Sequence, residues 1–296
     1  MLTTLWVMSI ASVIAMSAAL VGRHAVSEGS ARVELERGRW LALACERRAE
    51  AAIDGVLRDA TTLDEGALVW RTLPRHVLAS SLLAGCDVTF EGAGTRLDVN
   101  NASKEMVASL LAAIGSGEHA SEMADALDDW RDSDDVPLPL GAERGWYESA
   151  GRIVPRNGPL ADVGELRRVR GFEGIGGVDT VATTETGRVS LATAPVSVLM
   201  AVPGITRETA EQIVALQVAG TPLTDLLSVT GSISEASVSA LAARYADAVR
   251  ATTPDPDAWL VRVRVSRGVP AVSVRLEWRV IRTGSRCRVA GTRSIQ

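Results

Sequence analysis

The side chains best suited to chemistry lie in an acidic stretch between Glu118 and Glu148, which holds ten carboxylates and two arginines. Carboxylates at this density repel one another, so a folded segment of this kind needs arginine pairing, full solvation or a bound cation. Asp132 and Asp134 have the i, i+2 spacing by which a loop directs two carboxylates toward one point. Glu143 arrives after a turn imposed by two prolines and a glycine, and aromatic residues lie at both ends of the stretch.

This pattern predicts a cation site made of oxygen ligands, with no histidine or cysteine nearby, which favours Ca²⁺ over Zn²⁺. We expect its ligands to be Asp132, Asp134 and Glu143, with Asp129 or Asp135 as a further ligand and backbone carbonyls completing the shell. A solvated acidic face without an ion is the alternative, because the EF-hand pattern is not matched.

No other grouping of residues indicates catalysis. The cysteines, Cys45, Cys86 and Cys287, show no metal-binding spacing and allow one disulfide, whose partners the sequence does not choose. The three histidines are isolated from one another, and no Ser/His/Asp or Cys/His grouping can be read locally. We therefore expect that the protein is not an enzyme.

The amino-terminal segment 2–22 contains no charged residue. A helix of this length, rising 1.5 Å per residue, just spans a hydrocarbon core of ~30 Å. We predict a transmembrane anchor over residues 1–24, and its large apolar residues include Leu5, Trp6, Val7, Ile10, Val13, Ile14 and Leu20. A cleaved signal peptide is less favoured because no basic residue precedes the apolar run. A soluble core helix is also less favoured, since such helices rarely stay uncharged for so long.

From Ala25 to Arg58, apolar residues recur at mixed spacings of three and four, and proline is absent. This periodicity predicts an amphipathic helix that continues out of the membrane. A helix with an apolar first half and an amphipathic second half is typical of type IV pilins and pseudopilins. After it, the short apolar runs in segments 68–90 and 92–97 are interpreted as strands and turns. Residues 25–97 are therefore assigned to this helix and the first strands of a sheet.

The middle of the chain contains a duplication. Residues 96–103 align with residues 188–195 at a constant offset of 92, and each copy reads as a short strand, a helix cap and an apolar helix. The second copy continues with Val202-Pro203-Gly204-Ile205-Thr206, a helix-hairpin-helix signature. We predict an α-helical domain over residues 98–252, made of two related units at about 98–175 and 188–250, with the acidic stretch inserted in the first.

The carboxy-terminal segment 253–296 alternates apolar residues with arginines over 260–266 and 271–281, which predicts two strands, and a third is expected near 287–290. These strands need a partner, and the strands before Arg96 are available. The helical domain would then be an insertion in a small antiparallel sheet, so the fold class is α+β.

Helix-hairpin-helix units often bind DNA phosphates. Residues 188–250, however, carry four arginines and five acidic residues, so phosphate binding is disfavoured and a protein-packing role is preferred. We expect no nucleic acid as a partner. A membrane-tethered helix-hairpin-helix DNA-binding protein of competence type is retained as the alternative function.

Taken together, these pieces make the chain similar to the K-type minor pseudopilin of the type II secretion system (general secretion pathway protein K). The resemblance covers nearly the whole chain and rests on these motifs: Leu5-Trp6-Val7, Asp98-Val99-Asn100-Asn101-Ala102-Ser103, Asp128-Asp129-Trp130-Arg131-Asp132-Ser133-Asp134, Gly141-Ala142-Glu143, Trp146-Tyr147 and Ala192-Thr193-Ala194-Pro195. The acidic run followed by Gly-Ala-Glu and an aromatic pair is the most specific part.

The resemblance implies a pseudopilin fold with a long N-terminal membrane or filament helix, a small antiparallel sheet and a large inserted helical domain that holds Ca²⁺. It implies a single-pass protein of the inner membrane with its C-terminal domain in the periplasm. At the tip of the pseudopilus it would nucleate and cap the filament during protein export. The implied partners are the I- and J-type minor pseudopilins, the major pseudopilin and the inner-membrane assembly platform. One departure is that the family's basic leader ending in glycine is not seen before the apolar run, and a misassigned gene start is the preferred explanation.

Overall fold

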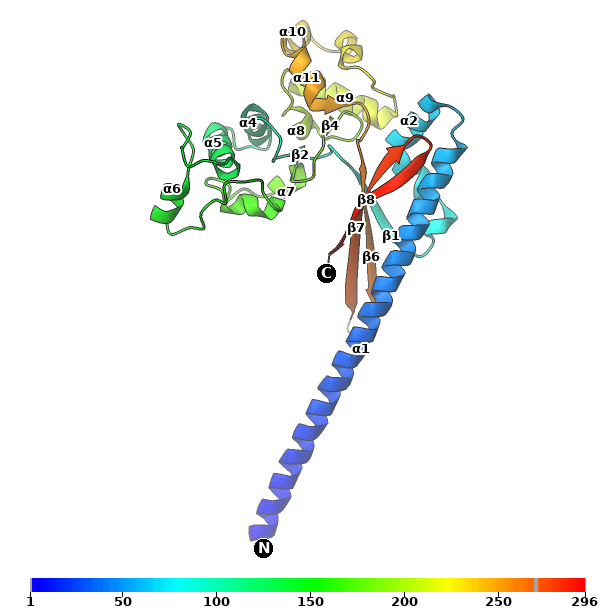
Figure 1. Cartoon of the computed structure of the whole chain (residues 1–296), viewed down its shortest axis with the longest axis vertical. Coiled ribbons are helices and arrows are strands. Elements are labelled where there is room, and N and C mark those ends of the chain that lie inside the picture. The colour runs from blue at the N-terminus through cyan, green and yellow to red at the C-terminus, as the bar shows by residue number, and fades with distance from the viewer. Residues whose placement is uncertain (1, 269–270, 296) are drawn as a thin grey trace.

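A single long helix dominates the computed structural model, which describes residues 2–268 and 271–295 (Figure 1). Helix α1 runs from Leu2 to Asp59, and its first part projects alone beyond the rest of the molecule. The region Thr3–Asp59 is long and apolar enough to cross a membrane, with a mean hydropathy of 2.0 in its apolar window. All the large apolar residues predicted as the anchor are exposed.

A four-stranded antiparallel sheet packs against the second part of α1. Its strands are β1 (Asp87–Gly92), β6 (Trp259–Arg267), β7 (Val272–Thr283) and β8 (Arg286–Ile295), in the order β1-β6-β7-β8. Small residues on α1 let the helix approach the strands closely, and a Cβ added at Gly38 would lie 2.9 Å from Val274 Cγ2. The core between helix and sheet includes Ala42, Ala49, Ile53, Val261, Val263 and Trp278.

The interpretation of residues 68–83 as strands is wrong. They lie in α2 (Leu63–Arg71), α3 (Leu73–Val77) and the 3₁₀ helix η1 (Ser81–Leu83), and strand β1 follows them. The start of α2 carries a capping arrangement in which the Thr62 hydroxyl accepts from Glu65 N and the Glu65 carboxylate accepts from Thr61 N. The periodicity of a short apolar run does not distinguish a strand from a helix, but a capping arrangement of this kind indicates a helix start.

Between β1 and β6 the chain forms a helical domain beside the end of the sheet (Figure 1). Its α-helices are α4 (Lys104–Ala113), α5 (Ala120–Arg131), α6 (Arg144–Ser149), α7 (Val178–Val181), α8 (Val196–Leu199), α9 (Arg207–Ala219), α10 (Glu235–Ala243) and α11 (Tyr245–Ala251). The 3₁₀ helices are η2 (Val163–Arg168) and η3 (Leu226–Ser232). Two short parallel pairs join β2 (Leu97–Asp98) to β3 (Ala182–Thr183) and β4 (Val189–Ser190) to β5 (Thr252–Thr253).

The two halves of this domain make matching contacts. Each half opens and closes with a strand of its own parallel pair. In the first half, Arg131 on α5 donates hydrogen bonds to the backbone carbonyls of Val99 and Ala102. In the second half, Gln217 on α9 donates to the carbonyls of Leu191 and Ala194, which lie 92 positions after Val99 and Ala102. Different residue types thus make the same backbone contact, so the duplication is clearer in the structure than in the sequence.

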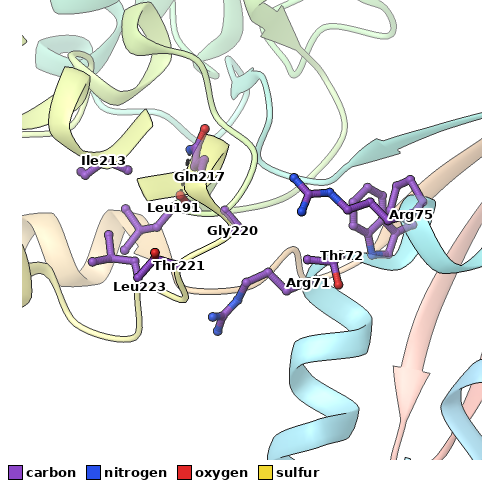
Figure 2. A pocket seen from close by; sticks show the side chains of 12 residues that line it. Arg71, Thr72, Arg75, Leu191, Ile213, Gln217, Gly220, Thr221 and Leu223 are labelled. Atoms are coloured by element: carbon purple, nitrogen blue, oxygen red, sulfur yellow. Dashed lines mark hydrogen bonds between the residues drawn. The ribbon is translucent and has the colours of Figure 1, made fainter. Parts of the chain in front are cut away.

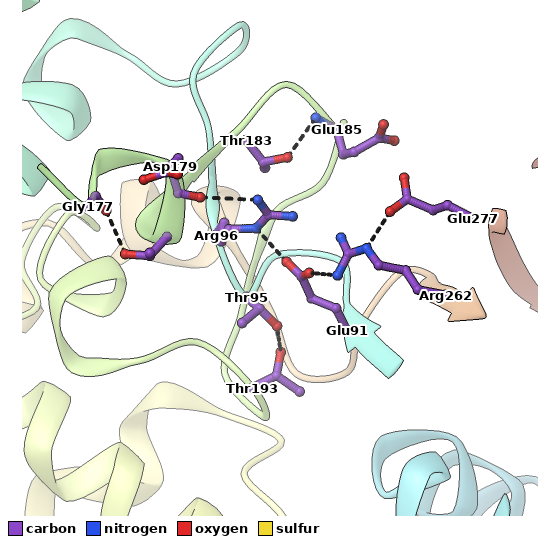
Figure 3. A network of polar contacts seen from close by, with 11 residues as sticks. Glu91, Thr95, Arg96, Gly177, Asp179, Thr183, Glu185, Thr193, Arg262 and Glu277 are labelled. Atoms are coloured by element: carbon purple, nitrogen blue, oxygen red, sulfur yellow. Dashed lines mark hydrogen bonds and ion pairs between the residues drawn. The ribbon is translucent and has the colours of Figure 1, made fainter. Parts of the chain in front are cut away.

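The chain leaves the sheet after β1 and returns to it before β6 at adjacent points, which together we call the joint. Ala93 N donates to Ala258 O at 2.8 Å, and Gly94 has φ +82° with no room for a side chain, because an added Cβ would lie 1.9 Å from Arg188 O. A chain of charges extends from this joint into the sheet (Figure 3): Arg96, Glu91, Arg262 and Glu277 alternate, each paired with the next.

Helices α2 and α3 support the other side of the joint. Trp70 Nε1 donates to Pro256 O at 2.7 Å, and Trp259 Nε1 donates to Trp70 O at 3.0 Å. A hollow of about 200 Å³ separates this region from α9, and Figure 2 shows Arg71 and Arg75 on one side and Ile213 on the other. These two hydrogen bonds therefore fix α2 to β6 and to the segment through which the chain returns to the sheet.

A candidate metal centre

Helix α5 presents two stripes of side chains. Met123, Leu127 and Trp130, at spacings of four and three, are buried in the core of the helical domain. Asp125 and Asp129 lie four residues apart on a second stripe, which ends at Asp132, the C-cap of the helix. A continuous helix through the acidic run therefore aligns carboxylates along one face.

Glu143 reaches the same place from the other side of the loop. It is the N-cap residue of α6, but its side chain makes no capping hydrogen bond. Asp129, Asp132 and Glu143 each offer a carboxylate oxygen, and these oxygens all lie within 4.8 Å of one another. Two oxygens that bind one Ca²⁺ at about 2.4 Å can lie no farther apart than about 4.8 Å, so the spacing fits that ion.

Among the described residues, no arginine, lysine or histidine forms an ion pair with these three carboxylates. Asp129 is 0% exposed and Glu143 is 5% exposed, and the two Glu143 oxygens accept no hydrogen bond. Burial, reinforced by the charges of Asp129 and Asp132, raises the pKa of Glu143 to about 7. Burial also raises the pKa values of Asp129 and Asp132. A buried group of this kind must take up either a proton or a cation.

Arginine does not provide the missing charge. Arg131 pairs with Asp128 at 2.5 Å and donates to backbone carbonyls. Arg144 lies 3.7 Å from Asp135, at the exposed end of the loop. Both arginines of the acidic stretch are thus engaged away from the three-carboxylate group, which supports a cation at that group.

The loop between Asp132 and Glu143 is held by the stripe on α5. Leu138 N donates to both Asp129 carboxylate oxygens, at 3.1 and 3.2 Å, and Leu140 N donates to Asp125 Oδ2 at 3.2 Å. Gly141 passes so close to Asp129 that an added Cβ would lie 1.9 Å from Oδ2. The same carboxylate that faces the centre therefore also fixes the path of the loop.

Two other predicted ligands lie outside this group. Asp134 is exposed, and its Oδ1 accepts a hydrogen bond from Val136 N at 2.8 Å. Asp135 is exposed and accepts from Asn157 Nδ2 at 3.0 Å. Among the five expected ligands, the structure brings together Asp129, Asp132 and Glu143, and calcium itself stays a prediction.

Asn157 was not recognised as a site residue from the sequence. It has φ +52°, and its Nδ2 donates to Asp134 O at 2.6 Å while its Oδ1 is buried without a hydrogen-bond donor among the described residues. An amide oxygen is a ligand type that Ca²⁺ accepts. At this position the sequence shows an Asn-Gly pair before a proline, which indicates a turn.

Comparison with known proteins gives a family match over part of the chain and a similar fold over most of it. Residues 85–174, which include the whole candidate centre, match the family model described as type II secretion system (T2SS), protein K. The fold is similar to a chain of the crystal structure of the GspK-GspI-GspJ complex from the enterotoxigenic Escherichia coli type 2 secretion system. The TM-score is 0.60 and the identity 16%, over 90% of this chain and 98% of that chain. No curated protein matches the sequence.

The long N-terminal helix packed on a small antiparallel sheet defines the α+β fold of a pseudopilin. With the family match over residues 85–174 and the pseudopilin fold, the comparisons bear out the resemblance to a K-type minor pseudopilin of the type II secretion system that was drawn from the sequence.

Proposed function

We propose that this protein stands at the tip of the type II secretion pseudopilus, where it nucleates and caps the filament and so takes part in protein export. The observation that supports this role most directly is an apolar stripe on the part of α1 that follows the anchor. Val33, Trp40 and Leu43 lie on it and are 51%, 72% and 41% exposed. An exposed tryptophan beside other apolar residues is typical of a protein interface.

The proposed partners are the I- and J-type minor pseudopilins, because the similar chain comes from a complex with GspI and GspJ. The major pseudopilin and the inner-membrane assembly platform are proposed as further partners. We infer that α1 anchors the protein in the inner membrane as a single-pass helix and that the sheet and the helical domain lie in the periplasm. The role is structural, and we propose no enzymatic activity.

Co-purification tests this role. The full chain in detergent, mixed with its I- and J-type partners at micromolar concentration, should form a heteromeric complex. Trp40→Ala should weaken that complex by about tenfold or more, the effect typical of an interface tryptophan, and should leave the melting temperature unchanged. Val218→Ala, at a position on α9 that is 78% exposed, is the matched control and should bind as the wild type does. A chain that stays monomeric beside both partners contradicts the proposal.

We also propose that Asp129, Asp132 and Glu143 hold Ca²⁺, with Asp134, Asp135 and backbone carbonyls as the remaining candidates for a shell of six to eight oxygens. The unpartnered Glu143 carboxylate supports this assignment. An ion that binds only the folded state stabilises it by RT ln(1+[L]/Kd), about 2.7 kcal/mol at a hundredfold excess over Kd.

Melting curves in calcium and in chelator test the metal. Calcium should raise the melting temperature of the full chain, and Asp132→Ala should abolish that difference. In chelator, Asp132→Ala should melt at the wild-type temperature or slightly above it, since one repelling charge is removed. Glu148→Ala, which removes an exposed carboxylate of the same acidic stretch outside the proposed shell, is the matched control and should keep the calcium effect. Identical wild-type curves in calcium and in chelator would rule the site out.

The DNA-binding alternative needs a hairpin that is free to approach phosphates. Gly204, in the hairpin turn, has φ +80°, and an added Cβ would lie 3.0 Å from Ala240 O on α10. This side of the turn packs on protein, which supports the structural role. A mobility shift of duplex DNA at sub-micromolar protein, weakening steeply with added salt, would instead favour the alternative.

A further inference from the structure

One face of the sheet is not covered by α1 and carries an uncompensated pair of arginines. Along β6, Val261, Val263 and Val265 are buried toward the helix, so the alternate residues point to the other face. Arg264 is one of these outward residues, and Arg275 on β7 is another; both are exposed. We call the surface around this arginine pair the open face.

Arg264 and Arg275 are directly opposite each other in the β6–β7 register. Directly opposite side chains have Cβ atoms about 4.5–5.5 Å apart, and like charges at such positions destabilise a sheet. Neither arginine makes an ion pair or a hydrogen bond with a described residue. Arg262, two positions along β6, shows the contrast, because its Nη1 lies 2.6 Å from Glu91 Oε2 and its Nε pairs with Glu277.

The arginine pair borders a hollow of about 310 Å³ on the open face. Its charged lining residues are Arg262, Arg264, Arg275, Asp87 and Glu277. Asp87 is opposite Arg264 on β1 but forms no ion pair with it, and Glu277 is already bound by Arg262. The positive charge in the hollow is therefore concentrated on the β6–β7 side.

We propose that the open face binds an acidic segment of a partner protein, with one carboxylate held between Arg264 and Arg275. Two adjacent guanidinium groups match the planar, bidentate geometry of a carboxylate. Asp87, Thr89, Ser266 and Ser273 are the other exposed residues among the described side chains around this pair, and none of these four offers an apolar anchor for lipid. The nearby Asp87 and Glu277 carboxylates disfavour a doubly charged phosphate more strongly than a single carboxylate.

This surface is separate from the apolar stripe at Trp40, because α1 packs on the opposite face of the sheet. The acidic partner segment therefore does not compete for the interface proposed for α1. A bound carboxylate also removes the repulsion between these two directly opposite arginines, a repulsion that the free protein retains.

A charged peptide probe tests the open face. The full chain in detergent is titrated against fluorescent hexaglutamate, with hexaserine as the uncharged peptide, and binding is followed by anisotropy at low salt. Arg264→Gln and Arg275→Glu should each weaken hexaglutamate binding at least tenfold. Asp87→Asn should tighten it several-fold because it removes a repelling charge. Arg207→Gln is the matched control, because Arg207 on α9 is exposed and forms no ion pair with a described residue, and it should change binding less than twofold.

The Arg275→Glu variant carries its own folding control. It replaces a like-charged pair by an opposite-charged pair, so its melting temperature should rise while peptide binding is lost. Equal affinities in Arg264→Gln, Arg275→Glu and the Arg207→Gln control, or no saturable binding of hexaglutamate, would overturn the proposal. It would also be overturned if inorganic phosphate bound more tightly than the peptide, or if anionic lipid vesicles bound the wild type and not these variants.

Discussion

Glu143 occupies a helix-capping position, but its side chain does not cap the helix. It begins α6 as the N-cap, yet its carboxylate is directed to Asp129 and Asp132 and makes no capping bond. Without an ion, burial and, after it, the charges of Asp129 and Asp132 favour the protonated form of Glu143, so its pKa is raised to about 7.

The pH dependence of stability should therefore carry a Glu143 component in chelator. The folded pKa is above the unfolded value of 4.5, so the folded chain binds the proton more tightly. This contribution to the free energy of unfolding is fully present below pH 4.5 and is lost as the pH rises through 7. Melting temperatures between pH 5 and 8 measure it.

Glu143→Gln is the matched variant because it stays neutral at every pH. In chelator it should lack this part of the decline and should be more stable than the wild type at pH 8. In calcium the order should reverse, because the amide is a weaker ligand than a carboxylate. A decline of the same size in both proteins would show that Glu143 is not the titrating group.

The candidate site also shows what sequence spacing can predict. The sequence predicts Asp132 and Asp134 as ligands from their i, i+2 spacing, and Glu143 from its place after the turn. The structure instead continues α5 to Arg131, and a helix aligns positions 125, 129 and 132. Where the helix ends decides which carboxylates meet, and helix ends are the least certain part of a sequence-based prediction.

Among the elements, the long periodic ones could be predicted and the short ones could not. Helix α1 and strands β6 and β7 carry many repeats of one period, so their type follows from the sequence. Helices α2 and α3 are too short to show a period, and their burial at Trp70 and Leu73 depends on contacts with residues far away in the chain.

The acidic loop is an element whose path depends on one glycine. Gly141→Ala should displace the loop or the Asp129 carboxylate, because its Cβ would overlap Oδ2. We expect a loss of about 1–3 kcal/mol of stability, the range typical of overpacking, together with loss of the calcium effect. Gly145→Ala, on α6 with no atom within 4 Å of the added Cβ, is the control and should retain both. Unchanged calcium stabilisation in Gly141→Ala would contradict this description of the loop.

At the scale of the whole molecule, a disulfide between Cys45 and Cys86 joins α1 to the start of β1. The sequence allowed any one pair, and the choice follows from the packing of Cys45 against the sheet. Cys287 remains a free thiol, with burial raising its pKa to about 12.

Removal of this disulfide should destabilise the protein. The bond closes a loop with a sequence separation of 41, for which chain entropy gives roughly 4 kcal/mol. Cys45→Ala/Cys86→Ala should therefore melt well below the wild type under oxidising conditions, whereas Cys287→Ala should change little. Alkylation at pH 8 should leave folded Cys287 largely unmodified, since its thiolate is scarce. Equal melting temperatures for all three proteins would contradict a structural role for the bond.

The placement of the helical domain between two neighbouring strands has a consequence for how the chain folds. Gly92 and Trp259 are directly opposite each other in the β1–β6 pair, so residues 93–258 form, in topology, the loop of a hairpin. Closing an unfolded loop of that length is entropically expensive, on the order of 4–5 kcal/mol. If the insertion folds first, its ends are already hydrogen-bonded to each other through Ala93 and Ala258, and strand pairing becomes nearly local. We therefore expect formation of the insertion to be the slow kinetic step. Strands β1 and β6 should then pair rapidly, because the folded insertion already holds its two ends together.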